Sequence, residues 1–280
     1  MLFLCATPIG NLSDISERVI TTLREADLIA CEDTRNSRKL FTHFAINTPF
    51  TSYHEYNKFE KAEELIGKME AGAHIALVTD AGTPAISDPG EVLVRRCHEQ
   101  GIPVTSLPGP CALITALSAC GLPARRFCFE GFLPADKKER REILEALSSE
   151  TRTIILYEAP HHLVKTLEAL YTVLGDRRLS LCRELTKKHE EICLTSIKEA
   201  LDAFETKEPR GEYVLVIEGK SLSEIKKKET EAFRSLSLKE HMALYEAQGL
   251  DQKECMKRVA KDLGVSKRDI YSALLSKEEP

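Results

Sequence analysis

Short apolar runs alternate with amphipathic stretches along the first 120 residues. Runs of four or five mainly aliphatic residues predict strands at Leu2–Cys5, Leu28–Cys31, Ile75–Thr79 and Val104–Leu107. Between them, apolar residues recur at helical spacing, as Val19 and Leu23 do behind a predicted cap at Ser13–Asp14. Strands that alternate with helices predict a parallel α/β sheet.

The pattern resumes after Gly121. Further strands are predicted at Phe127–Phe129, Ile154–Tyr157, Leu179–Cys182 and Tyr213–Ile217. We therefore expect two α/β domains, 1–121 and 122–220, then a charged linker at 221–235 and a helical tail at 236–280. The tail has a helix-turn-helix pattern around Gly264. With eight Lys and Arg against eight Asp and Glu, it suits packing or protein contact as well as nucleic-acid docking.

Composition narrows the class of protein. With 42% hydrophobic residues in 280, the chain can bury a sizeable core. No apolar run is long enough to span a membrane and no signal segment is evident, so a cytoplasmic location is predicted. The nine cysteines lie mostly in apolar runs without CxxC pairs and are interpreted as reduced core thiols. No spacing of His, Cys or Asp indicates a metal site.

Unusual residues gather directly after the predicted strands, at the edge where open α/β sheets bind ligands. The loop 6–12 has one glycine where the dinucleotide fingerprint needs three, and Pro8 lacks an amide for a phosphate cradle. The loop 79–90 is rich in glycine, proline and hydroxyls, and its Asp80 can accept from ribose hydroxyls or face a cation. These loops predict a ligand site that is not of the Rossmann dinucleotide type.

A series of short motifs occurs in order over the first 220 residues. They are ATPIGNL (6–12), EDTR (32–35), RKL (38–40), SYHE (52–55), TDAGTPAISDPG (79–90), LPGP (107–110), GFLP (131–134), YEAPH (157–161) and RELTK (183–187). In this combination the chain resembles the bacterial family of small-subunit ribosomal RNA methyltransferases, within the tetrapyrrole methylase superfamily. The string at 79–90 is the most specific part of the resemblance.

The resemblance implies an S-adenosylmethionine-dependent enzyme that methylates the ribose 2′-hydroxyl of a cytidine in the decoding region of 16S rRNA, in the small ribosomal subunit. It also implies a homodimer, with the cofactor in the cleft between the two α/β domains. Carried over by position, the cofactor-binding residues are Ile9, Asp80, Thr83, Cys111, Ala112, Tyr157, Glu184 and Tyr213. Two positions depart from the family pattern: Cys111 replaces the usual serine, and His162 stands where arginine is common.

Methyl transfer to a hydroxyl requires an acceptor oxygen held in line with the methyl carbon and a group that takes the proton. The strand-end loops offer six candidates, Glu32, Asp33, His54, Glu55, Asp80 and Asp88. We predict Glu32 or Asp33 as the base and Arg35 as a clamp on the RNA backbone or the alkoxide. The alternative is that these residues only cap and pair on the helix that follows.

Two basic clusters are predicted to bind RNA. One comprises Arg38 and Lys39, next to Arg35, and the other comprises Lys137, Lys138, Arg140 and Arg141. Because the net charge is -5, RNA contact has to rely on such local patches. Charge runs on helices are usually solvated faces, and it is the resemblance that favours phosphate contact here.

Two other functions compete with RNA methylation. A methylase acting on a tetrapyrrole carbon would keep the superfamily, but the EDTR and SYHE loops and the basic helix favour the RNA branch. The second competing function is a ligand-sensing regulator that binds DNA through its tail. It is disfavoured because the tail is neutral and because the unusual residues gather in the loops after the strands instead.

Overall fold

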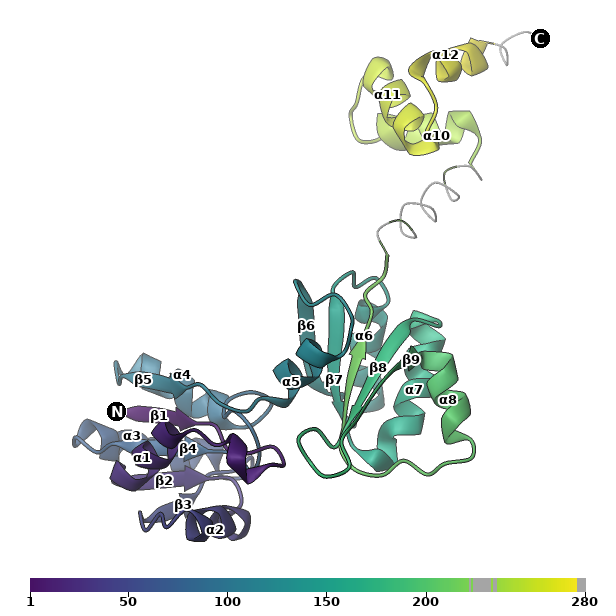
Figure 1. Ribbon diagram of the computed structural model, residues 1–280. Helices are drawn as coiled ribbons and strands as arrows, with labels where there is room; N and C mark the ends of the chain where they lie inside the picture. Colours follow the sequence, from purple (N-terminus) through teal and green to yellow (C-terminus); the bar gives the residue numbers. More distant parts are fainter. Residues whose placement is uncertain (222, 224–232, 234–235, 276–280) are drawn as a thin grey trace. The chain divides into compact units, whose positions relative to one another are not determined.

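The computed structural model describes residues 1–221, 223, 233 and 236–275, in two compact units, Met1–Gly219 and Lys220–Pro280 (Figure 1). The larger unit contains two five-stranded sheets and the smaller one is helical. This arrangement confirms the predicted fold class. The predicted charged linker lies almost entirely outside the described residues.

The first sheet is wholly parallel, in the order β3-β2-β4-β1-β5. Its strands are β1 (Leu2–Cys5), β2 (Leu28–Cys31), β3 (Phe50–Ser52), β4 (Ile75–Val78) and β5 (Val104–Leu107). Four of them match the predicted strands. The fifth, β3, was not predicted, because three residues with a single large apolar side chain give no recognisable pattern.

Helices cover both faces of this sheet. On one face, Ile75 and Leu77 pack against α3 (Lys58–Glu70) and α4 (Gly90–Glu99). On the other, Ala76 and Val78 pack against α1 (Glu17–Glu25) and α2 (Thr34–His43). Because neighbouring strand residues point to opposite faces, a strand covered on both sides is apolar throughout, as β4 is.

The first helix begins later than predicted. Ser16 is the N-cap of α1, and its side chain accepts from the amide of Val19 at 3.2 Å. Ser13 and Asp14 instead lie in a short 3-10 turn, Leu12–Asp14, so the predicted cap was wrong. Both sites carry side chains that can cap a helix, so the sequence alone does not distinguish them.

The second sheet is mixed, in the order β6-β7-β10-β8-β9. Its strands are β6 (Phe127–Phe132), β7 (Thr153–Glu158), β8 (Arg178–Arg183), β9 (Glu191–Ser196) and β10 (Tyr213–Ile217). Only the pair β6 and β7 is parallel, and the other pairs are antiparallel. The edge strand β9 was not predicted, because its first four residues are exposed and mix charged with apolar side chains.

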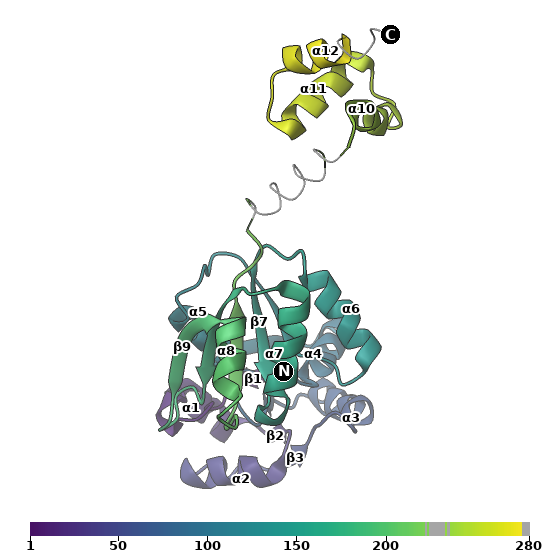
Figure 2. The ribbon, with the colours of Figure 1, turned by 90° about the vertical axis from the view of Figure 1, so that its right-hand side faces the viewer.

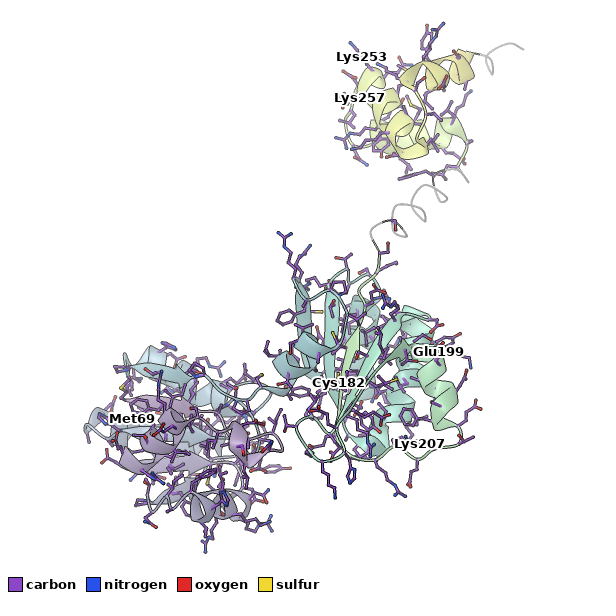
Figure 3. The ribbon with its side chains drawn as sticks, viewed as in Figure 1. Met69, Cys182, Glu199, Lys207, Lys253 and Lys257 are labelled. Carbon is purple, nitrogen blue, oxygen red and sulfur yellow. The ribbon has the colours of Figure 1, made fainter. Side chains whose placement is uncertain are left out.

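Helices also cover this sheet on both faces (Figure 2). Helices α6 (Lys137–Leu147), α7 (Pro160–Leu174) and α8 (Ile197–Phe204) pack on one face. Helix α5 (Ala112–Ala119) packs on the other, against residues that include Cys182. Cys182 lies inside this unit, and Glu199 lies at its periphery on α8, where it completes a capping box (Figure 3).

The smaller unit contains α10 (Leu238–Glu246), α11 (Gln252–Leu263) and α12 (Lys267–Leu275), which confirms the predicted helical tail module. Gly264 ends α11 with a left-handed φ of 67°, as the sequence pattern predicted for a turn. The buried residues Met242, Cys255, Val259 and Ile270 form its core. Lys253 and Lys257 project from α11 on its exposed side (Figure 3).

All nine cysteines are free thiols, as predicted. Most are buried, and Cys193, on the edge strand β9, is the exposed exception. Among the described residues no helix is both long and apolar enough to cross a membrane.

Candidate active site

A cavity of about 330 Å³ opens where strand ends of both sheets meet. From the first sheet it is lined by loops that follow β1, β4 and β5, which supply Ile9, Asp80 and Cys111. From the second it is lined by Tyr157 at the end of β7 and Tyr213 at the start of β10. These two residues share one edge because β10 runs antiparallel to β7. The volume suits a small ligand.

Seven of the eight predicted cofactor residues line this cavity. They are Ile9, Asp80, Thr83, Cys111, Ala112, Tyr157 and Tyr213. The eighth, Glu184, does not line it. Its backbone is left-handed, with φ 50°, and its carboxylate accepts from Lys187 Nζ at 2.8 Å and from the Glu212 amide at 3.0 Å. Glu184 therefore holds two residues that themselves line the cavity.

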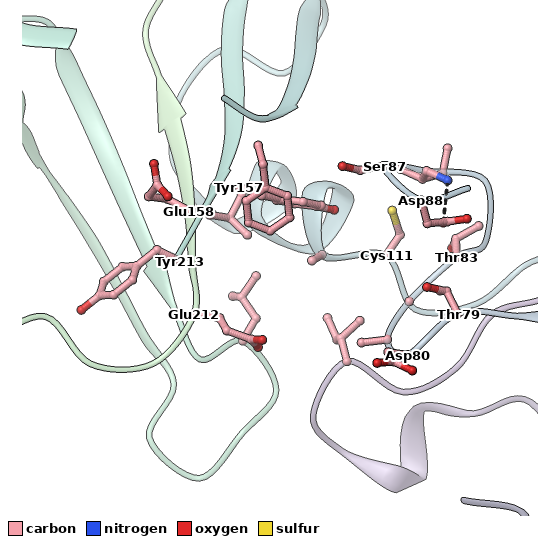
Figure 4. Close-up of a pocket in the computed structure, with 18 of the residues that line it drawn as sticks. Thr79, Asp80, Thr83, Ser87, Asp88, Cys111, Tyr157, Glu158, Glu212 and Tyr213 are labelled. Carbon is pink, nitrogen blue, oxygen red and sulfur yellow. Dashed lines mark hydrogen bonds between the residues drawn. The ribbon is translucent and has the colours of Figure 1, made fainter. Parts of the chain in front are cut away.

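The loop 79–90 is held in shape by its own polar groups. The Asp88 carboxylate accepts from the amides of Ala85, Ile86 and Gly90 at 3.0, 3.2 and 2.7 Å. Thr83 Oγ1 donates to the Pro110 carbonyl at 2.9 Å, which ties this loop to the one after β5. Asp88 and Thr83 face the cavity from this side (Figure 4). Asp88, a candidate base in the sequence, is thus the organiser of its loop.

Two carboxylates meet at the end of β4. Glu32 Oε2 accepts from Thr79 Oγ1 at 2.7 Å and from the Asp80 amide at 3.4 Å. The Asp80 oxygens accept from the Asp33 amide at 3.1 Å and from Asn36 Nδ2 at 3.3 Å. Desolvation raises the pKa of Asp80 above its ordinary value, and the nearby negative charges of Glu32 and Asp33 add to this.

The other two predicted catalytic residues bind one another. Asp33 is the N-cap of α2 and accepts from the Arg35 amide at 2.7 Å and from Arg35 Nη2 at 2.8 Å. The hydrogen bonds from Arg35 lower the pKa of Asp33 to about 2. Neither residue lines the main cavity, whereas Glu32 does. The capping and pairing that the sequence offered as an alternative are present in the structure.

The cavity is acidic. Its lining includes the carboxylates of Glu32, Asp80, Asp88, Glu158 and Glu212. Lys187 is the one cation among the lining residues, and its Nζ lies 2.8 Å from carboxylate oxygens of both Glu184 and Glu212. A cationic ligand fits such a lining.

Sequence reasoning missed a buried network behind the cavity. Glu158 is 6% exposed, and its carboxylate accepts from the Ala159 amide at 2.8 Å and from the hydroxyl of Thr166. Arg140 Nη2 donates to the same hydroxyl at 2.7 Å. Arg140, predicted to bind RNA, is therefore engaged inward. The YEAPH motif contains Glu158, but no pattern in the sequence links Glu158 to Arg140 or to Thr166.

The two basic clusters differ in their partners. On α6, Arg141 Nε pairs with Glu145 at 2.6 Å and Lys138 Nζ lies 4.0 Å from Glu142. On α2, Arg38 lies over the Phe50 ring at 5.6 Å, and Lys39 forms no ion pair with any residue that the structure describes. No group of three or more His, Cys, Asp or Glu residues within the described chain is placed to hold a metal ion.

Solved structures define the class of fold. The larger unit resembles a uroporphyrin-III-C-methyltransferase from Thermus thermophilus, with a TM-score of 0.55 and 19% identity over 77% of this chain and 93% of that one. It also resembles a diphthine synthase, with a TM-score of 0.60 and 15% identity over 79% and 90% of the two chains. The chain therefore has the fold of these proteins.

The family follows from sequence comparison. The family model of Tetrapyrrole (Corrin/Porphyrin) Methylases matches residues 1–201, and the chain belongs to this family. A relative from Halalkalibacterium halodurans, named "Ribosomal RNA small subunit methyltransferase I", is 48% identical over 97% of this chain and 93% of its own. A relative of the same name from Bacillus subtilis is 44% identical over 98% and 93%. The resemblance inferred from the motifs is confirmed.

Proposed function

We propose that the protein transfers a methyl group from S-adenosylmethionine to ribosomal RNA of the small subunit. The observation that carries this proposal is that relatives named as small-subunit ribosomal RNA methyltransferases match nearly the whole chain at 44 to 48% identity. From the motif resemblance we add the finer assignment: the acceptor is the ribose 2′-hydroxyl of a cytidine in the decoding region of 16S rRNA. Such a substrate is found in the cytoplasm, where we place the protein.

The main cavity has the character that the methyl donor requires. S-adenosylmethionine supplies an electrophilic methyl group on a positively charged sulfur, and the acidic lining favours a cation. Ile9, Leu185 and Val214 give it apolar walls. The Tyr157 hydroxyl accepts from the Leu113 amide at 3.1 Å, and burial raises the pKa of Tyr157 to about 12, so it stays protonated and available as a donor.

The predicted residues divide into three roles. Ile9, Asp80, Thr83, Cys111, Ala112, Tyr157 and Tyr213 would bind the donor, and Glu184 would act through Lys187. Glu32, directly after β2, and Asp80, at the end of β4, both line the cavity and can act on a hydroxyl proton. Asp33 and Arg35 lie beside them, and Arg35, whose side chain is 88% exposed, can still meet an RNA backbone.

We also propose a homodimer, supported by apolar residues exposed on one face of the second sheet. Ile192 and Leu194 lie on the edge strand β9 and are 38% and 47% exposed. They pair with Cys182 and Ser180, so they share the face that carries α5. Ile114, on α5, is 51% exposed. A second copy would cover these side chains, and Leu194→Glu should then convert dimer to monomer in sedimentation equilibrium.

The function is tested with small ribosomal subunits that lack the modification. Purified protein and radiolabelled S-adenosylmethionine should transfer label to the 16S RNA, and nuclease digestion should recover it in a 2′-O-methylated cytidine. Calorimetry checks donor binding separately. Label that enters a porphyrinoid and never the subunit would instead support a tetrapyrrole methylase. Absence of donor binding by folded protein would contradict both functions.

A further inference from the structure

A second cavity, of about 320 Å³, shares Thr79 and Asp80 with the main one. One wall is the loop after β1, where Pro8, Gly10 and Leu12 line it. Leu12 is a large apolar residue that is 43% exposed. The second cavity is thus lined by both polar and apolar residues. Two of them, Thr79 and Asp80, also line the candidate active site.

The opposite wall is one face of α2. Asn36, Lys39, Leu40 and His43 line the cleft, at positions i, i+3, i+4 and i+7 of the helix. This face combines a carboxamide, a cation, a branched apolar side chain and an imidazole. Lys39 also lines a shallow depression with Arg35 and Arg38, so the cleft opens onto the basic side of α2.

The loop after β1 separates the two cavities. Ile9 lines the main cavity, while its neighbours Pro8 and Gly10 line the second. A Cβ at Gly10 would lie only 2.4 Å from Lys187 Cγ and 3.0 Å from the Leu185 carbonyl, so the loop packs directly on the segment after β8. This close packing fixes the position of the loop that separates the two cavities. Thr79 and Asp80, which line both cavities, lie next to each other (Figure 4).

Resting on the proposed function, we propose that the second cavity receives the acceptor nucleotide of the RNA strand, and that Asp80 takes the proton from its attacking ribose hydroxyl. The base of the nucleotide would lie between Leu12 and Leu40, its phosphate near Lys39 and its sugar at Asp80. The donor would occupy the main cavity, which adjoins the second one at Thr79 and Asp80.

In the reaction, the ribose oxygen forms a bond to the methyl carbon as the bond from that carbon to sulfur breaks. The bonding pair stays on sulfur, which becomes a neutral thioether, and the hydroxyl proton passes to Asp80. Glu32 is less suited to this step, because it does not line the second cavity, whereas Asp80 does. Glu32 and Asp33 instead position Asp80.

The subsite is tested by filling the cleft. His43→Trp places a large ring in it, and His98→Trp is the matched control, since both histidines are exposed in the last turn of a helix of the first domain. For His43→Trp we expect kcat/KM for unmodified subunits to fall at least ten-fold, on the order of one missing binding contact, with donor affinity unchanged. His98→Trp should match wild type. A His43→Trp enzyme with wild-type kinetics would overturn the subsite.

The base is tested by comparing Asp80→Asn with Glu32→Gln at saturating donor. Loss of a general base should lower the single-turnover rate of Asp80→Asn by about 10² to 10⁴ and remove its rise with pH. Glu32→Gln should lose less and keep that rise. An Asp80→Asn enzyme that retains the rise would overturn the assignment. If wild-type protein binds the donor yet labels no subunit RNA, the proposed function fails instead, so the two failures are distinguishable.

Discussion

Helices α2 and α6 both follow a strand, both begin with an aspartate cap and both carry a basic cluster, yet their cations are used differently. On α6, Arg141 and Lys138 face glutamates one turn further along the same helix. On α2, segment 34–43 contains no carboxylate, and Lys39 has no ion-pair partner among the described residues. Helix α2 thus places a cation without an ion-pair partner in the lining of the second cavity, next to the candidate active site.

The comparison teaches that the number of cations on a helix does not predict phosphate contact. An exposed pair at i,i+4 contributes little to stability but neutralises much of the local field. The resulting hypothesis is that α2 binds the RNA backbone near the reacting nucleotide, while α6 serves mainly the structure of the second sheet through Arg140.

The largest difference is expected from charge reversal. Arg38→Glu with Lys39→Glu should weaken RNA binding at least ten-fold. The slope of log affinity against log salt concentration should become less steep by about 1.4, because two single-strand phosphates contribute about 0.7 each. Lys138→Glu with Arg141→Glu is the matched control on α6, because both cations already face glutamates there, and it should change both quantities far less. Filter binding over a range of salt concentrations measures both. Equal losses in the two double variants would contradict the division of roles.

Much of this could be predicted from the sequence, because the signals are local. Buried parallel strands such as β4 read as apolar runs, and Asp80 and Thr83 are recognisable within one motif. The partners of Arg140 could not be predicted, since Thr166 and Glu158 approach it only through the packing of α6 and α7 on one sheet. The role of Glu184 could not be predicted for a similar reason, because Glu212, whose amide it binds, lies 28 residues further along the sequence.

The inward role of α6 predicts a loss of stability at Thr166. Thr166→Val removes the hydroxyl that joins Arg140 to Glu158 in a site where Thr166 is fully buried, and should lower the free energy of unfolding by about 1 to 3 kcal/mol. Thr172→Val is the control on the same helix, because Thr172 is exposed and its hydroxyl bonds only the Glu168 carbonyl. Urea denaturation compares them. A neutral Thr166→Val would show that the network does not hold α6.

A smaller effect is expected from a single exposed cation of α6. Arg141→Gln breaks its pair with Glu145, but the side chains are 79% and 55% exposed, so stability should not change measurably. RNA affinity should change less than two-fold, because Glu145 already compensates this charge. Lys39→Gln is the matched substitution on α2. If Arg141→Gln weakened binding as much as Lys39→Gln does, α6 would have to be counted as part of the RNA interface.

The smallest effect is expected in the acid dependence of stability, which should differ between the N-caps of the two helices, Asp33 on α2 and Asp136 on α6. Because hydrogen bonds from Arg35 lower the pKa of Asp33 from 3.8 to about 2, ionised Asp33 stabilises the folded state above its ordinary pKa, and this contribution disappears as the pH falls from 3.8 toward 2. Arg35→Gln should therefore flatten the decline of thermal stability over that window. The matched change on α6 is Lys138→Gln, since Lys138 is likewise two residues after the cap, and Asp136 accepts only from backbone amides there. Scanning calorimetry should show no such flattening for Lys138→Gln. An unaltered decline in Arg35→Gln would mean that the Asp33 carboxylate is held by the helix end itself, leaving Arg35 free to meet the RNA.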